Sequence, residues 1–138
     1  MELGRLDSLA SLDLSHNRFS IFPESKGTLK SLTHLLLSGN RLIGSLPQSV
    51  GLLSSLTHLY LDRNQFTGSL PTSIGNLGSL TQLHLFNNEV SGTLPHSMNK
   101  LSSLTELLLQ SNKLNGTLGD SIGQLRLSTL RLDDNLFE

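Results

Sequence analysis

Leucines recur along this chain in a fixed pattern that ends on a polar residue. Residues 32–40 read LTHLLLSGN, with leucine at the first, fourth and sixth positions and asparagine at the ninth. The same spacing returns at 56–64, 80–88 and 104–112, as LTHLYLDRN, LTQLHLFNN and LTELLLQSN. Leucines two residues apart lie on one face of a β-strand, so the pattern predicts one short, half-buried strand in every unit.

The asparagine that closes each unit sets the period of the chain. The six positions are Asn17, Asn40, Asn64, Asn88, Asn112 and Asn135, and the intervals between them are 23, 24, 24, 24 and 23 residues. A fixed period of this length predicts a solenoid, in which each coil buries its apolar face against its neighbours. An unpaired buried amide costs about 1 to 3 kcal/mol. We therefore expect these asparagines to form a structural ladder that bonds the backbone of adjacent coils and has no ligand role.

A second motif follows the asparagine in three units. It reads GSLPQSVGLL at 44–53, GSLPTSIGNL at 68–77 and GTLPHSMNKL at 92–101. Together the two motifs resemble the leucine-rich repeats, and in particular the plant-type class of about 24 residues. Two glycines recur in the motif, as at Gly68 and Gly75, although Asn99 replaces the second one in the third copy; they are expected where the coil turns sharply or takes a positive φ.

The resemblance covers essentially all 138 residues and implies a fold. That fold is a β-dominated solenoid of the α/β type, a right-handed superhelix with a concave parallel sheet. A second short strand is implied near Gly-x-Leu-Pro, with 3₁₀ or short helical turns on the convex side. The resemblance also implies recognition of a protein or peptide through the concave face. Many members of the class form outer domains of plant receptor kinases and receptor-like proteins.

The ends of the chain fall inside a repeat. Met1 has the phase of Thr72 and Glu138 the phase of Ser91, so residues 1–138 are interpreted as one domain of about six repeats with both ends incomplete and uncapped. Two explanations stay open. The chain is a piece of a longer array, or it is a scaffold that self-associates head to tail through its ends.

The residues beside the strand leucines change from unit to unit and should form columns on one surface, since neighbouring strands lie about 4.8 Å apart. Apolar and aromatic side chains gather in the centre of these columns and charged ones at the rim, which is typical of a protein-binding patch. Scattered apolar side chains are also normal on protein surfaces, so an inert face stays an alternative. The candidate ligand-binding residues are His34, Leu36, His58, Tyr60, Asp62, Arg63, His84, Phe86, Glu106, Leu108 and Arg131.

Three of these candidates, His34, His58 and His84, fall on consecutive predicted strands. Histidines in a row suggest either a metal site or a contact that depends on pH. Metal ligands must converge on one point, whereas a strand surface spreads them apart. We therefore expect no metal, and pH-dependent binding stays open.

Composition and charge exclude several other functions. Ten Lys and Arg residues against eleven Asp and Glu give a formal charge of −1 without a basic cluster, which argues against nucleic acid as a partner. No apolar run approaches the roughly 18 residues that span a bilayer, so no direct membrane contact is expected.

Catalytic signatures are absent from the sequence as well. No phosphate-binding loop, nucleophile turn or HExxH pair occurs, so the sequence predicts neither an enzyme nor a bound cofactor. Asn115-Gly116-Thr117 is a glycosylation sequon, which has meaning only if the protein is secreted. The compartment follows from the parent protein: the extracellular face of the plasma membrane for a receptor-like parent, and otherwise the cytoplasm.

Overall fold

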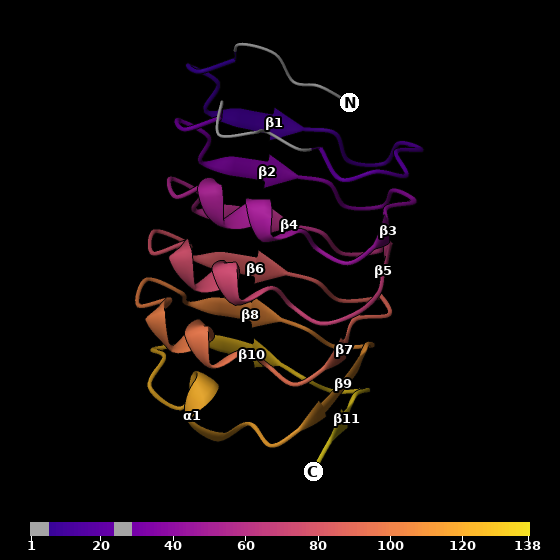
Figure 1. Cartoon of the computed structure of the whole chain (residues 1–138), viewed down its shortest axis with the longest axis vertical. Coiled ribbons are helices and arrows are strands. Elements are labelled where there is room, and N and C mark those ends of the chain that lie inside the picture. The colour runs from indigo at the N-terminus through magenta and orange to yellow at the C-terminus, as the bar shows by residue number, and fades with distance from the viewer. Residues whose placement is uncertain (1–5, 24–28) are drawn as a thin grey trace.

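One three-residue strand from each coil builds a six-stranded parallel sheet (Figure 1). The computed structural model describes residues 6–23 and 29–138. The sheet runs in chain order through β1 (Ser11–Asp13), β2 (His34–Leu36), β4 (His58–Tyr60), β6 (Gln82–His84), β8 (Glu106–Leu108) and β10 (Thr129–Arg131). All five pairings are parallel. The β-dominated solenoid expected from the leucine spacing is confirmed.

Shorter elements complete each coil. A second set of strands comprises β3 (Ile43–Gly44), β5 (Gln65–Phe66), β7 (Ser91–Gly92), β9 (Lys113–Gly116) and β11 (Leu136–Phe137). They form a two-stranded sheet, β3-β5, and a three-stranded one, β11-β9-β7. The 3₁₀ helices are η1 (Gln48–Leu52), η2 (Thr72–Asn76) and η3 (His96–Lys100), each preceded by an extended proline. Gly119 takes the place of that proline in the next coil, which instead forms α1 (Gly119–Ile122).

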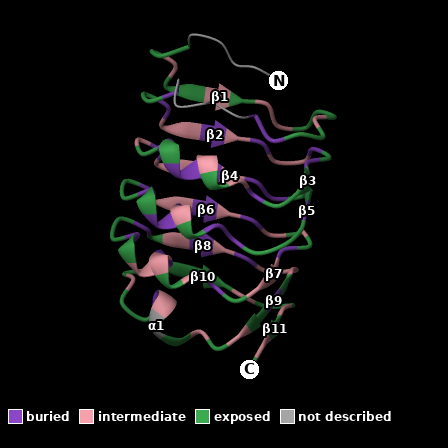
Figure 2. Ribbon diagram, in the orientation of Figure 1, coloured by how far each residue is buried: buried purple, intermediate pink, exposed green. Residues whose placement is uncertain are grey.

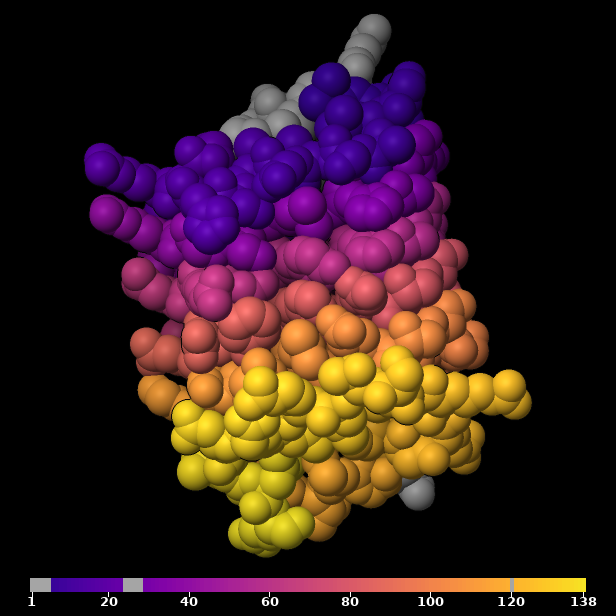
Figure 3. Space-filling view, turned by 180° about the vertical axis from the view of Figure 1, so that it is seen from behind, coloured from indigo at the N-terminus to yellow at the C-terminus, as the bar shows by residue number. Residues whose placement is uncertain are grey.

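The apolar core is continuous through the middle coils. In the coil of β6, Leu80 and Leu83 are fully buried and Leu85 is 1% exposed. Figure 2 shows buried positions recurring at the same place in successive coils, with exposed positions on the outer loops. Viewed from the opposite side, the coils form bands that follow chain order (Figure 3). Each coil therefore buries its apolar face on its immediate neighbours, as in other solenoids.

The two recurring glycines meet different demands. Gly68 has a φ of +67°, in the left-handed region that a side chain strains. Gly75 is not among the positive-φ residues; a Cβ at this position would lie 2.4 Å from the carbonyl oxygen of Ser97 in the next coil. Close packing of successive 3₁₀ turns thus accounts for Gly75.

The asparagines connect adjacent coils. Asn64 is buried, and its Nδ2 donates to the carbonyls of Leu37 (3.0 Å) and Leu61 (3.1 Å). Its Oδ1 accepts a hydrogen bond from the Leu42 backbone N–H at 3.0 Å. The same bonds to the preceding coil recur at Asn40, Asn88, Asn112 and Asn135. Asn17 is exposed and donates to Leu14 and Ser15 of its own coil.

Candidate functional site: the outer face of the sheet

Strand register aligns the variable residues into columns. We call the outward side chains of the six-stranded sheet and of the residues just after its strands the sheet face. One column runs His34, His58, Gln82 and Glu106, and the next runs Leu36, Tyr60, His84 and Leu108. All eight side chains are half-buried, because they lean on one another while keeping one side toward solvent.

Five rings from three consecutive coils form a continuous row on this face, which we call the aromatic row. The rings of His34 and His58 are stacked, with centroids 4.3 Å apart, and so are those of Tyr60 and His84, at 4.1 Å. His58 meets Tyr60 edge-on at 6.0 Å, and His84 lies 6.3 Å from Phe86. The row therefore presents planar apolar faces in fixed orientations, which is typical of a binding hot spot.

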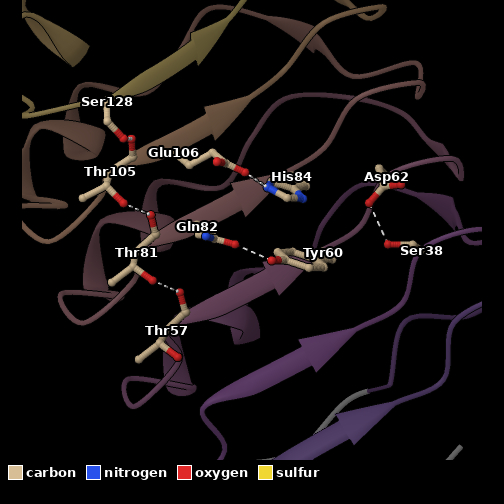
Figure 4. Close-up of polar contacts among 10 residues, drawn as sticks. All are labelled: Ser38, Thr57, Tyr60, Asp62, Thr81, Gln82, His84, Thr105, Glu106 and Ser128. Carbon is tan, nitrogen blue, oxygen red and sulfur yellow. Dashed lines mark hydrogen bonds and ion pairs between the residues drawn. The ribbon is translucent and has the colours of Figure 1, made fainter.

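Hydrogen bonds along the sheet hold the central rings in place (Figure 4). The hydroxyl of Tyr60 donates to Oε1 of Gln82, and Nε2 of His84 lies 2.5 Å from Oε1 of Glu106. Burial raises the pKa of Tyr60, and the charges of Glu106 and Asp62 add to the effect. The phenol therefore stays protonated at neutral pH and remains a donor.

Arg63 covers one end of the aromatic row. Its guanidinium carbon lies 5.5 Å from the centroid of Phe86, within the range of a cation–π interaction. Arg63 itself has a φ of +54°, and the residue before the ladder asparagine has positive φ in every coil: His16, Gly39, Arg63, Asn87, Ser111 and Asp134. This left-handed corner was not predicted from the sequence, although Gly39, Asn87 and Asp134 are residue types that favour a positive φ.

The exposure of the Asp62 side chain differs from the prediction. The sequence placed it on the exposed rim, but the side chain is only 4% exposed and accepts a hydrogen bond from the Ser38 hydroxyl at 2.6 Å (Figure 4). A neighbouring serine on the adjacent coil satisfies the carboxylate, so it can fold against the sheet. We therefore remove Asp62 from the candidate contact surface and assign it a role in packing.

The remaining charged candidate, Arg131, lies in the last strand, opposite Leu108. Its guanidinium donates to both carboxylate oxygens of Asp133, at 3.1 Å and 2.9 Å. Both side chains are more than half exposed, so this pair is a solvated feature at one side of the face.

Comparison with known proteins identifies the family. A family model described as a leucine-rich repeat region matches residues 1–135. The chain belongs to the leucine-rich repeat family. Comparison with curated protein sequences gave no significant match.

Among solved structures, this leucine-rich repeat chain is similar to plant receptor ectodomains. The plant peptide hormone receptor RGFR1 in complex with RGF2 is 36% identical, with a TM-score of 0.90 over 96% of this chain and 22% of that one. A TDR receptor is 40% identical, with a TM-score of 0.89 over 94% and 23% of the two chains. The Arabidopsis receptor kinase HAESA ectodomain, in complex with an IDA peptide hormone, is 37% identical, with a TM-score of 0.80 over 93% and 22%. The chain thus spans less than a quarter of these structures.

Recurring threonines of the leucine-rich repeats line one side of the sheet face. The hydroxyls of Thr33, Thr57, Thr81, Thr105 and Ser128 each donate to a backbone carbonyl of the preceding coil. Figure 4 shows the bonds of Thr81, Thr105 and Ser128. Recurrence of this hydroxyl in five successive coils is typical of an architectural residue. In two coils the same threonine also contacts a histidine of the aromatic row, at Nδ1 of His34 and of His58, both at 2.9 Å.

Other site classes receive no support from residues 6–23 and 29–138. No group of three or more His, Cys, Asp or Glu side chains in these ranges is arranged to hold a metal ion. Within the same ranges, none of the helices has the length and apolar content that a membrane span needs. Asn115 is exposed on β9, in the second set of strands and away from the sheet face, and its glycosylation stays a prediction.

Proposed function

We propose that the chain is a non-enzymatic recognition module of a receptor-like protein, and that its sheet face binds a peptide or protein. The aromatic row is the observation that carries this proposal, because it concentrates flat apolar surface on three adjacent coils. Support also comes from the similar receptors, two of which are complexes with RGF2 and with an IDA peptide hormone.

Pre-organisation explains how such a face would bind. Stacking and hydrogen bonds already fix the rings of Tyr60 and His84 in the free protein. A ligand that packs against them therefore costs less side-chain entropy than one that must order mobile rings. Leu36 and Leu108 extend the apolar surface on both sides, while Arg63 and Glu106 offer charges of opposite sign at its edge.

Replacing Tyr60 and Phe86 together by alanine should weaken ligand binding by about 2 kcal/mol or more, or roughly 30-fold, because it removes two anchors of the row. The ligands for this test are peptides selected from a random library against the unmodified chain. Their affinities for both proteins are measured by titration calorimetry.

The matched control is Ile43→Ala, which removes a 59%-exposed apolar side chain from β3, outside the sheet face. Selected peptides should bind this variant as well as they bind the unmodified chain. Equal binding to the Tyr60/Phe86 variant would reject the sheet face as the binding surface and favour a scaffold role.

A further inference from the structure

We propose that the stacked imidazoles of His34 and His58 form an oxyanion site that takes a carboxylate of the bound peptide and holds it more tightly as the solution is acidified. This inference names a ligand group for the sheet face, and so it rests on the proposed function. Three features of the pair lead to it: fixed tautomers, parallel rings and a missing counter-charge.

Threonine hydroxyls fix the tautomers. A hydroxyl has one proton to donate. Thr33 donates its proton to the Ala10 carbonyl at 2.8 Å, and Thr57 donates to the Thr33 carbonyl at 3.0 Å. Each threonine oxygen can therefore only accept from the adjacent imidazole, whose Nδ1 lies 2.9 Å away. In both rings Nδ1 carries a proton, and Nε2 is the atom left for a ligand.

The two Nε2 atoms lie side by side. His34 and His58 are directly paired across β2 and β4, and the planes of their rings differ by 12°. Since both rings are held at Nδ1 by the equivalent threonine, their opposite edges point the same way. Both side chains are half-buried, so this edge stays accessible from one side. When protonated, the pair offers two parallel N–H donors, which suits two oxygens of one anion.

No carboxylate of the described residues is hydrogen-bonded or ion-paired to His34 or His58. On β6, the side chain facing His58 is Gln82, and on β1 the one facing His34 is Ser11, both uncharged. Tyr60 meets His58 edge-on, with its hydroxyl bonded to Gln82. The nearby carboxylates are occupied elsewhere: Glu106 by His84, Asp62 by Ser38, and Asp13 by the backbone N–H of Ser15. His84 thus has an acidic partner in Glu106, whereas none of the residues in 6–23 and 29–138 is an acidic partner of His34 or His58.

Protonation and anion binding must then be linked. Burial lowers the pKa of His58, the charges of His34 and His84 lower it further, and the more weakly acting charge of Glu106 partly offsets them. The fold therefore biases the free His58 imidazole toward its neutral form. A bound carboxylate favours the charged form and raises the pKa. Wherever the bound histidine is protonated and the free one is not, binding takes up a proton, so affinity rises as pH falls from about 7.5 to 5.5.

Histidine-selective ¹⁵N NMR of the full chain tests the site directly, since it reports the tautomer and the pKa of all five imidazoles. The probes are acetyl-tetra-alanine with a free C-terminal carboxylate, the same peptide as its amide, and sodium sulfate, all at one ionic strength set with sodium chloride. We expect Nδ1–H tautomers at His34 and His58. We also expect the carboxylate peptide to raise the pKa of His58 by about one pH unit. The amide form of the peptide should leave that pKa unchanged.

Internal controls separate a specific site from screening. His16 and His96 lie outside the aromatic row and should not respond to any probe. His34→Gln should abolish the response of His58 to the carboxylate peptide, whereas His96→Gln should leave it intact. A response to sulfate together with the carboxylate peptide supports the oxyanion site, and a response to sulfate alone overturns the assignment to a peptide carboxylate.

Three other outcomes would overturn the inference: Nε2–H tautomers in the pair, no response to the carboxylate peptide, or an equal response in all five histidines.

Failure of the oxyanion site is distinguishable from failure of the proposed function. If the Tyr60/Phe86 variant loses library peptides while His58 ignores the carboxylate, only the oxyanion site is rejected. If the carboxylate peptide raises the pKa of His58 while library peptides bind the Tyr60/Phe86 variant as well as the unmodified chain, Tyr60 and Phe86 are rejected as the anchors.

Discussion

Replacing Phe66 by alanine is expected to lower the free energy of unfolding by about 4 kcal/mol, within the range of about 3 to 5 kcal/mol for buried phenylalanines. The Phe66 ring has no exposed surface and packs edge-on against Phe22, which lies two coils earlier in the chain, with centroids 6.4 Å apart. Its loss leaves a cavity inside the apolar core. The measurement is the urea midpoint and slope, followed by circular dichroism.

The matched control is the same substitution at Phe86. This ring is half-buried on the sheet face, where its loss opens no internal cavity. Phe86→Ala should change the free energy of unfolding by less than about 1 kcal/mol. Similar losses at Phe66 and Phe86 would mean that the two rings do not divide between core and surface.

Replacing Asn64 by leucine should cost about 2 to 4 kcal/mol, although leucine is apolar and similar in volume. The change leaves the Leu42 N–H without its acceptor and removes one of the two amide donors from the carbonyls of Leu37 and Leu61. Each carbonyl keeps its other donor, from Asn40 and Asn88 respectively. The unpaired N–H pays its full desolvation cost, about 1 to 3 kcal/mol, and the two weakened carbonyls add to it. Equilibrium unfolding in urea measures the loss.

Asn17 provides the control for this prediction. It occupies the same phase, but it is exposed and donates only within its own coil. Asn17→Leu should therefore cost less than about 1 kcal/mol. If Asn64→Leu were equally mild, the asparagines would not be the bonds that join the coils.

The strand registers and most of the core could be predicted from the sequence because the repeat makes them redundant. Leu35, Leu59, Leu83 and Leu107 share one phase, and all of them are at most 1% exposed. A position that recurs at the same place in every coil must meet the same neighbours above and below. The columns of the sheet face follow from that register alone.

Features that depend on contacts between two variable residues could not be predicted from the sequence. Asp62 is buried because Ser38 of the adjacent coil donates a hydrogen bond to its carboxylate. This pairing occurs at one place only in the repeat pattern, so the period of the sequence could not predict it. The stacking of His34 on His58, and of Tyr60 on His84, likewise depends on ring orientations set by individual hydrogen bonds. The left-handed corner at Arg63 was missed because polar side chains, rather than a regular glycine, occupy it.

An alanine scan of β6 and the two residues after it tests the division between invariant core and variable face most directly. The free energy of unfolding of each variant is measured in urea. The positions are Gln82, Leu83, His84, Leu85 and Phe86. An alternating result is predicted: losses of about 2 to 5 kcal/mol at Leu83 and Leu85, and less than about 1 kcal/mol at the other three. Equal losses along the segment, or the larger ones at His84 and Phe86, would contradict the assignment of the sheet face to ligand recognition.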